Sequence, residues 1–157
     1  MVGTERRQRI FDVGELLCGT YEVGEVLGQG GMGQVLAAFD RSLHRKIAIK
    51  ASWPHVDRSL LRAEAQALAA LRHPNMLTVY ALCEHDAVPF LAMERIFGIE
   101  LRAHLSRRAR EGLAISPREA IDLLLPVAES LAAMHAAGLA HRDVKPANVM
   151  LTVGGRI

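Results

Sequence analysis

The apolar positions of this chain change from a strand-like pattern to a helix-like pattern and back again. Short runs of apolar and β-branched residues, bounded by glycine or polar turns, predict strands. Between residues 57 and 71 leucines recur instead at helical spacing, and His73-Pro74-Asn75 ends that helix because proline cannot continue it. We therefore expect five strands with one helix inserted after the third. The predicted strands are Tyr21–Leu27, Gln34–Phe39, Lys46–Ser52, Met76–Leu82 and Val88–Met93.

The second half of the chain has a helical pattern. A short basic helix is predicted at Leu101–Arg110, and Ser116-Pro117-Arg118-Glu119 has the residues of a capping box with proline at the first helical position. Pro126 should kink the helix that follows, Gly138 should end it, and a short strand is expected at Val149–Leu151. The helix carries an apolar stripe made of Ile121, Leu124, Leu125, Ala128, Leu131 and Met134.

Composition narrows the classes of function. The 157 residues are 50% hydrophobic, which is enough to bury a core, and the formal net charge of +2 is too small to favour a nucleic-acid partner. Cys18 and Cys83 lie far apart and match neither a disulfide framework nor metal-ligand spacing, so we expect free thiols. There is no signal peptide and no apolar run of about 18 residues or more. We therefore expect no membrane segment in this chain and a cytoplasmic location.

A glycine-rich segment lies between the first two predicted strands. Residues 28–35 read Gly-Gln-Gly-Gly-Met-Gly-Gln-Val and fit the pattern Gly-x-Gly-x-x-Gly-x-Val. Glycines allow backbone amides to approach phosphate oxygens because no Cβ intervenes. The pattern alone is weak, and an ordinary hairpin turn is the more frequent reading. A strand rather than a helix follows the glycines, which disfavours a dinucleotide-binding fold.

Two charged residues occur in apolar surroundings. Lys50 lies in the apolar strand Ala48-Ile49-Lys50, where a lone buried ammonium group would be costly. Glu64 lies on the apolar face of the predicted helix. Taken singly, Lys50 reads as an edge-strand residue that reaches water and Glu64 as a surface residue. Together they predict an ion pair.

The residues needed for phosphoryl transfer occur together in His141-Arg142-Asp143-Val144-Lys145-Pro146-Ala147-Asn148. An Asp can accept a hydroxyl proton, a Lys can offset charge on a moving phosphoryl group, and an Asn can hold a metal ion. This spacing assigns those roles to Asp143, Lys145 and Asn148. His141, next to Arg142 and Asp143, could act as a general base, whereas the family resemblance described below implies a structural role.

The glycine segment, the strand with Lys50, the helix with Glu64 and the segment from His141 to Asn148 have the order and spacing found in protein kinases. From Tyr21 to Ile157 the chain resembles bacterial serine/threonine kinases of eukaryotic type. The resemblance implies an α+β fold. A small lobe would combine a five-stranded antiparallel sheet with one helix, and an incomplete, mainly helical large lobe would follow. The implied division is an N-terminal extension at 1–20, a small lobe with hinge at 21–97 and a partial large lobe at 98–157.

The resemblance also implies ATP and Mg²⁺ as cofactors, a protein Ser/Thr hydroxyl as substrate, and a role for each site residue. Lys50, paired with Glu64, would bind the α- and β-phosphates. Asp143 would orient and deprotonate the substrate hydroxyl, Lys145 would contact the γ-phosphate, and Asn148 would ligate Mg²⁺. Glu94 and Ile96 would offer hinge backbone groups to adenine behind the gatekeeper Met93. Adenine would lie among Leu27, Val35, Ala48 and Met150, and the phosphates under Gly28, Gln29, Gly30, Gly31, Met32 and Gly33.

The family places an Asp-Phe-Gly motif beyond the last predicted strand, and this sequence contains none. We therefore expect a kinase fragment that is inactive alone. The apolar stripe after Ser116 should lack its usual cover, so we expect aggregation, a molten large lobe or self-association through that surface. The alternative is a non-catalytic module that binds a nucleotide or a partner protein. A small-molecule phosphotransferase is disfavoured because Lys145 is atypical of that class.

Overall fold

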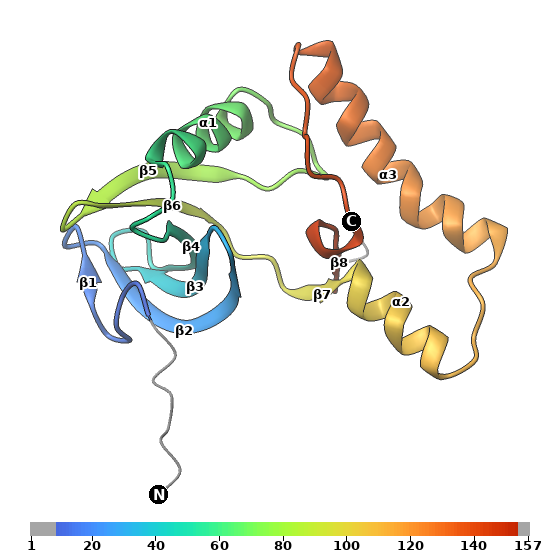
Figure 1. Cartoon of the computed structure of the whole chain (residues 1–157), viewed down its shortest axis with the longest axis horizontal. Helices are drawn as coiled ribbons and strands as arrows, with labels where there is room; N and C mark the ends of the chain where they lie inside the picture. The colour runs from blue at the N-terminus through green and yellow to red at the C-terminus, as the bar shows by residue number, and fades with distance from the viewer. Residues whose placement is uncertain (1–8, 154–157) are drawn as a thin grey trace, which may run out of the picture. The chain divides into compact units, whose positions relative to one another are not determined.

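The computed structural model describes residues 9–153, which fall into two compact units. The first unit contains the residues up to Ala69 together with Thr78–Arg95, and the second contains Ala70–Leu77 and the residues from Ile96 onward. Figure 1 labels the elements. In chain order they are β1 (Leu16–Leu17), β2 (Tyr21–Gly30), β3 (Gly33–Asp40), β4 (Arg45–Ser52), α1 (Arg58–Ala69), β5 (Val79–His85), β6 (Val88–Glu94), β7 (Gly98–Glu100), α2 (Leu101–Arg110), α3 (Pro117–Ala136), the 3₁₀ turn η1 (Pro146–Asn148) and β8 (Met150–Thr152).

The first unit is built on an antiparallel sheet with the strand order β1-β2-β3-β4-β6-β5. Side chains alternate between its two faces. One face carries Leu36, Ile47, Ile49 and Phe90, all with no exposed surface, and forms the main core. The predicted α+β class is confirmed, and the sheet has a sixth strand that the apolar pattern did not predict.

That extra strand belongs to the segment we interpreted as an N-terminal extension. Leu16 and Leu17 pair with Glu22 and Tyr21 of β2, so the sheet begins before the predicted boundary at residue 20. Leu17 is fully buried and Phe11 is 4% exposed. The Phe11 ring meets the Phe90 ring edge to face at 5.8 Å. Residues 9–20 therefore help to close the core of the first unit.

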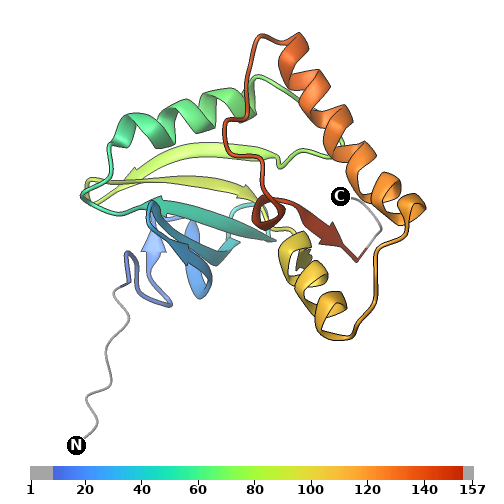
Figure 2. The same cartoon turned by 45° about the vertical axis from the view of Figure 1, so that its right-hand side comes forward.

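Helix α1 covers part of the opposite face of the sheet. Leu61 and Ala65 of α1 pack with Leu91 of β6, and Val79 of β5 lies against this cluster. Figures 1 and 2 both show α1 running along β5 and β6. The helix is thereby fixed on the face that also carries Ala48 and Lys50, since these residues pair with Met93 and Leu91.

Helices α2 and α3 of the second unit have the ends that the sequence predicts. The Ser116 side chain accepts a bond from the Glu119 amide while the Glu119 carboxylate accepts one from the Ser116 amide, which completes the capping box. At the other end Gly138 has φ of 72°, and Leu139 donates to the carbonyl oxygen of Met134. Helix α3 continues without interruption through Pro126.

The loop after α3 returns to the start of α2. Strands β7 and β8 form a small antiparallel pair, and the Leu101 amide donates to the carbonyl oxygen of Val149 at 2.8 Å. A Cβ on Gly98 would lie 2.1 Å from the carbonyl oxygen of Leu151, so only glycine fits there. This pairing fixes residues 146–152 against the N-terminal end of α2.

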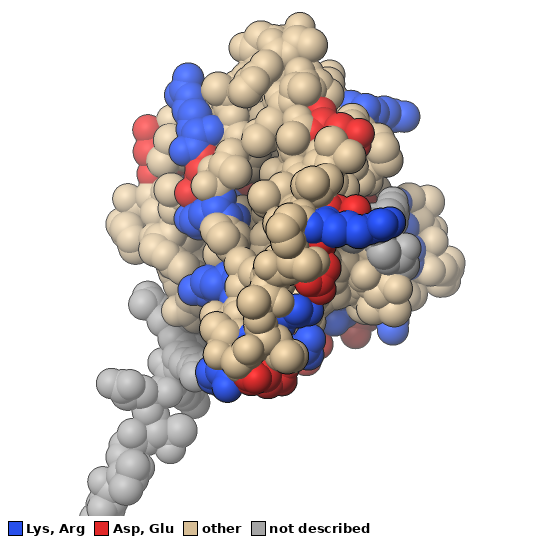
Figure 3. All heavy atoms as spheres, turned by 90° about the vertical axis from the view of Figure 1, so that its right-hand side faces the viewer, with Lys and Arg blue, Asp and Glu red and all other residues tan. Residues whose placement is uncertain are grey.

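The surface of the second unit keeps apolar side chains exposed. Ile121, Leu124 and Leu125 of α3 are 62%, 55% and 53% exposed. Figure 3, a space-filling view of one face of the molecule, shows basic and acidic side chains interspersed among broad areas without charged side chains. Over residues 9–153, no helix combines the length and the apolar character needed to cross a membrane.

Candidate functional site

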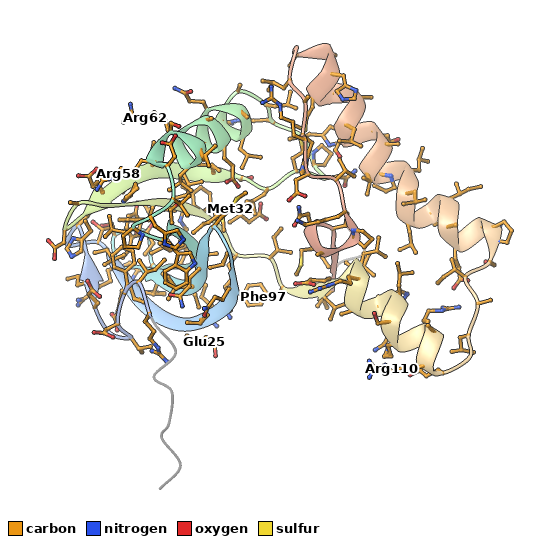
Figure 4. All side chains as sticks on the ribbon, viewed as in Figure 1. Glu25, Met32, Arg58, Arg62, Phe97 and Arg110 are labelled. Carbon is orange, nitrogen blue, oxygen red and sulfur yellow. The ribbon has the colours of Figure 1, made fainter. Side chains whose placement is uncertain are left out.

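The glycine segment forms the tip of the β2–β3 hairpin. Pairing continues through Gly28↔Val35 and Gln29↔Gln34 to Gly30↔Gly33, so the strands extend further into the glycines than the predicted ends at Leu27 and Gln34. Only Gly31 and Met32 remain for the turn. Met32, labelled in Figure 4, lies at this tip and is 64% exposed. Gly33 lies against β4, where a Cβ would come within 1.9 Å of the carbonyl oxygen of Ala51.

Two residues that the sequence analysis did not single out hold this hairpin. The Trp53 indole nitrogen donates to the carbonyl oxygen of Gly30 at 2.8 Å. The Gln34 side chain is 1% exposed, donates to the side-chain oxygen of Gln29 at 3.1 Å, and accepts a bond from the Ile10 amide at 2.9 Å. The available signals were that Trp53 is the single tryptophan and that Gln34 is the one polar residue of the predicted strand Gln34–Phe39.

Lys50 and Glu64 form an ion pair in the first unit. The Lys50 Nζ atom lies 2.7 Å from both carboxylate oxygens of Glu64, and the two side chains are 29% and 38% exposed. Lys50 is in β4 and Glu64 in α1, so the packing of α1 on β6 determines where the amine points. The register pairs Val35 with Lys50 and Ala37 with Ala48, which places Val35, Ala48 and Lys50 on one face of the sheet.

The other predicted adenine contacts of the first unit differ in exposure. Ala48 and Met93 are 4% and 7% exposed and are register partners, whereas Leu27 is 43% exposed. The Glu94 amide donates to the carbonyl oxygen of Thr78 at 2.8 Å. The Glu94 amide is therefore already engaged with the residue that precedes β5.

Asp143, Lys145 and Asn148 form one cluster in the second unit. The Asn148 side-chain nitrogen donates to the Asp143 carboxylate at 2.9 Å and to its backbone oxygen at 2.8 Å, while Lys145 Nζ lies 2.8 Å from the carboxylate. The hydrogen bond from Lys145, then the one from Asn148, holds the pKa of Asp143 below its usual value. Asp143 is therefore an anion at neutral pH.

The backbone of this loop is held in an unusual conformation. Arg142 has φ of 62°, in the left-handed region that non-glycine residues seldom adopt. The Asp143 amide donates to Nδ1 of His141 at 3.3 Å, and η1 turns the chain so that Asn148 faces Asp143. His141 thus supports the loop backbone, in agreement with the structural reading of this residue.

The predicted site residues divide between the two units. The first unit holds the glycine hairpin, Lys50, Glu64, Met93 and Glu94, and the second holds Ile96, the Asp143 cluster and Met150. Within each unit the structure brings together the charged groups that the sequence pairs, Lys50 with Glu64 and Asp143 with Lys145 and Asn148.

The Asp143 cluster has the donor atoms that a hard cation prefers. Both hydrogen bonds to Asp143 use the Asn148 amide nitrogen, which leaves the amide oxygen Oδ1 as the ligand atom. Carboxylate and amide oxygens suit Mg²⁺, which usually takes only one or two protein ligands and fills its other positions with water and phosphate oxygens. Between residues 9 and 153, no group of three or more His, Cys, Asp or Glu side chains is arranged to hold a metal ion. The set therefore fits a nucleotide-bound Mg²⁺ better than a metal held by protein alone.

Comparison with known proteins gives a consistent family. Residues 21–157 match the protein kinase domain family. The chain is 40% identical over 147 residues to the probable serine/threonine-protein kinase PknB of Corynebacterium glutamicum, with 87% of this chain and 22% of that protein covered. It is 38% identical over 141 residues to PknB of Mycobacterium tuberculosis, with 84% of this chain and 22% of that protein covered. The chain thus spans about a fifth of the length of these relatives.

Solved structures give the same result for the fold. The PknI kinase domain of Mycobacterium tuberculosis matches with a TM-score of 0.76 at 32% identity, covering 92% of this chain and 59% of that one. The apo form of PpkA-294 matches with a TM-score of 0.82 at 23% identity, covering 95% and 60%, and supports the fold alone. Sequence, fold and relatives together show that this chain belongs to the protein kinase domain family.

Proposed function

We propose that this chain binds Mg·ATP and supplies the nucleotide-binding and catalytic-loop residues of an enzyme that phosphorylates Ser or Thr hydroxyls of proteins. The observation that carries the proposal is the Asp143 cluster. One carboxylate is held as an anion between a cation and an amide, each within 3 Å. That set can orient a hydroxyl group, accept its proton and hold a metal ion.

Each residue of the cluster has one task. Asp143 orients the substrate hydroxyl and can accept its proton, because the carboxylate is ionised at neutral pH. Lys145 moves from Asp143 to the γ-phosphate, and Asn148 offers Oδ1 to Mg²⁺. Bound Mg·ATP would supply the phosphoryl group, and its Mg²⁺ would supply positive charge that offsets the negative charge of the phosphate oxygens. Catalysis then depends mainly on positioning and electrostatics.

Most of the residues that bind and orient the nucleotide belong to the first unit, while Ile96 and Met150 belong to the second. Lys50 binds the α- and β-phosphates, and Glu64 keeps its amine in place through the 2.7 Å pair. The amides of residues 28–33 cover the phosphates. Leu27, Val35, Ala48 and Met150 surround adenine, Met93 limits the depth of its site, and the carbonyl oxygen of Glu94 and the amide of Ile96 are its backbone partners.

We propose further that this chain alone turns over at background rate. The sequence lacks Asp-Phe-Gly, whose Asp is the second metal ligand that the family resemblance implies. Removal of one electrostatic partner of a reacting group commonly costs about 3 kcal/mol in activation free energy, or more. Nucleotide binding should survive this loss because the remaining contacts are present.

The test measures nucleotide binding and phosphoryl transfer separately. Thermal unfolding is followed with and without Mg·ATP, and incorporation of labelled γ-phosphate is measured in the same preparation. We expect Mg·ATP to raise the melting temperature of the wild-type chain and not that of a Lys50→Met variant, with incorporation at background. No shift in the wild type would refute nucleotide binding. Incorporation that depends on Asp143 would refute the proposed inactivity.

A further inference from the structure

The tip of the glycine hairpin has little to hold it apart from hydrogen bonds. A Cβ added to Gly28, Gly30 or Gly31 would meet no atom within 4 Å, so neighbouring side chains do not restrain these residues sterically. Glycine also has more backbone freedom than any other residue. The last hairpin pair is Gly30↔Gly33, and beyond it only Gly31 and Met32 complete the turn. Any contact that fixes this tip therefore has a large influence on its conformation.

Trp53 makes two hydrogen bonds to this tip, one on each side of the turn. Its indole nitrogen donates to the carbonyl oxygen of Gly30 at 2.8 Å, and its backbone amide donates to that of Met32 at 3.2 Å. The side chain is 9% exposed. A buried indole N–H needs a partner, and here the partner is the hairpin itself.

The position of Trp53 in the chain links the hairpin to Lys50. Trp53 directly follows β4, and Lys50 is three residues earlier in the same strand. β4 also contacts the hairpin through Gly33, whose backbone pairs with Ser52 and leaves no room for a Cβ. One short segment therefore places the Lys50 amine and restrains the glycine amides.

We propose that Trp53 is a positioning residue for phosphate binding: its indole N–H holds the glycine hairpin in the conformation that receives the phosphates of a nucleotide. This inference rests on the proposed function and adds a residue to it. Trp53 touches neither adenine nor phosphate in this account. Its loss should weaken ligands with phosphates and leave a ligand without them unaffected.

The test compares two ligands on three forms of the whole chain. Trp53→Phe keeps an aromatic ring and removes the indole donor, while Tyr21→Phe removes a hydroxyl from the same sheet, far along β2 from the hairpin tip. Affinities for Mg·ADP and for adenosine are measured by calorimetry. We expect Trp53→Phe to weaken Mg·ADP about three- to tenfold, the range for one lost hydrogen bond, with adenosine unchanged. Tyr21→Phe should change neither affinity.

The outcomes separate this inference from the proposed function. A wild-type chain that binds neither ligand refutes the proposed function, and the inference with it. If the wild-type chain binds both ligands, the proposed function stands whatever the variant does. Trp53→Phe could then bind both ligands with unchanged affinity, or it could lose affinity for both equally. Either result with this variant refutes the positioning role and makes Trp53 a packing residue.

A second measurement needs no variant. Trp53 is the single tryptophan of the chain, so its fluorescence reports on the contact with Gly30. Mg·ADP should shift or quench the emission because its phosphates act on the hairpin, and adenosine should leave it unchanged. Equal emission changes with both ligands, or none with Mg·ADP at saturation, would overturn the proposal.

Discussion

The two units of this protein bury their apolar residues to different extents. The first closes a core around Leu36, Ile47, Ile49 and Phe90, and even its N-terminal segment contributes Phe11 and Leu17. In the described part of the second unit, only Leu101 and Met134 are buried apolar residues, while Ile121, Leu124 and Leu125 of α3 are exposed. The first unit is therefore held by packing and the second largely by helix caps and polar bonds. Each nonetheless keeps its charged site residues in contact.

The largest expected effect is a difference in unfolding free energy between a substitution in the core of the first unit and one on α3. Phe90 has no exposed surface, and its ring meets those of Phe11 and Tyr21. Phe90→Ala should lower the unfolding free energy by about 3–5 kcal/mol. Leu124→Ala, on a side chain that is 55% exposed, should change it by less than about 0.5 kcal/mol. Urea unfolding followed by Trp53 fluorescence and circular dichroism measures both, and equal losses would contradict the contrast.

The next effect concerns association through α3. The exposed residues Ile121, Leu124 and Leu125 form an apolar surface through which chains can associate. We therefore expect the apparent molecular mass to rise with protein concentration. The double variant Ile121→Glu with Leu125→Lys should reduce this association and keep the helix, since the new charges stand four residues apart. Leu43→Lys, at an isolated exposed position of the first unit, is the matched control. A wild-type chain that sediments as a monomer at every concentration would refute self-association.

The smallest effect is a pH dependence at the start of α3. Hydrogen bonds from the Ser116 amide and side chain, joined by Arg108, lower the pKa of Glu119 from its ordinary value of 4.5. A carboxylate with a lowered folded pKa stabilises the fold above its unfolded pKa, and this contribution is lost as the pH falls through the folded value. Helix content of the wild type should therefore decline below about pH 4.5 more than that of Glu119→Gln. Identical acid profiles would show that Glu119 contributes nothing measurable.

Local signals in the sequence predicted much of the fold. Helix α2 has the predicted bounds Leu101–Arg110, and the capping box at Ser116 is present because cap chemistry is decided within four residues. The Lys50–Glu64 pair followed from the cost of charge in apolar surroundings. The start of β5 was predicted less accurately, because the predicted strand began at Met76 whereas the observed strand begins at Val79. An apolar run does not say where a pairing partner begins.

The features that were not predicted depend on contacts between distant segments. Phe11 packs on Phe90, and the Ile10 amide reaches Gln34 over 24 residues. The indole of Trp53 finds Gly30 only because β3 and β4 align in one register. No periodicity in the sequence encodes such partners, because each bond depends on the three-dimensional arrangement of both segments.

The central proposal is that Lys50 and Asn148 both contribute to the binding of Mg·ATP, Lys50 through phosphate and Asn148 through the metal ion. Calorimetric titration of ATP with and without Mg²⁺ tests it most directly, on the wild type, Lys50→Met and Asn148→Ala. The account predicts that Lys50→Met weakens binding under both conditions and that Asn148→Ala weakens it only when Mg²⁺ is present. Wild-type binding that neither variant alters, or an Asn148→Ala loss of equal size without Mg²⁺, would contradict it.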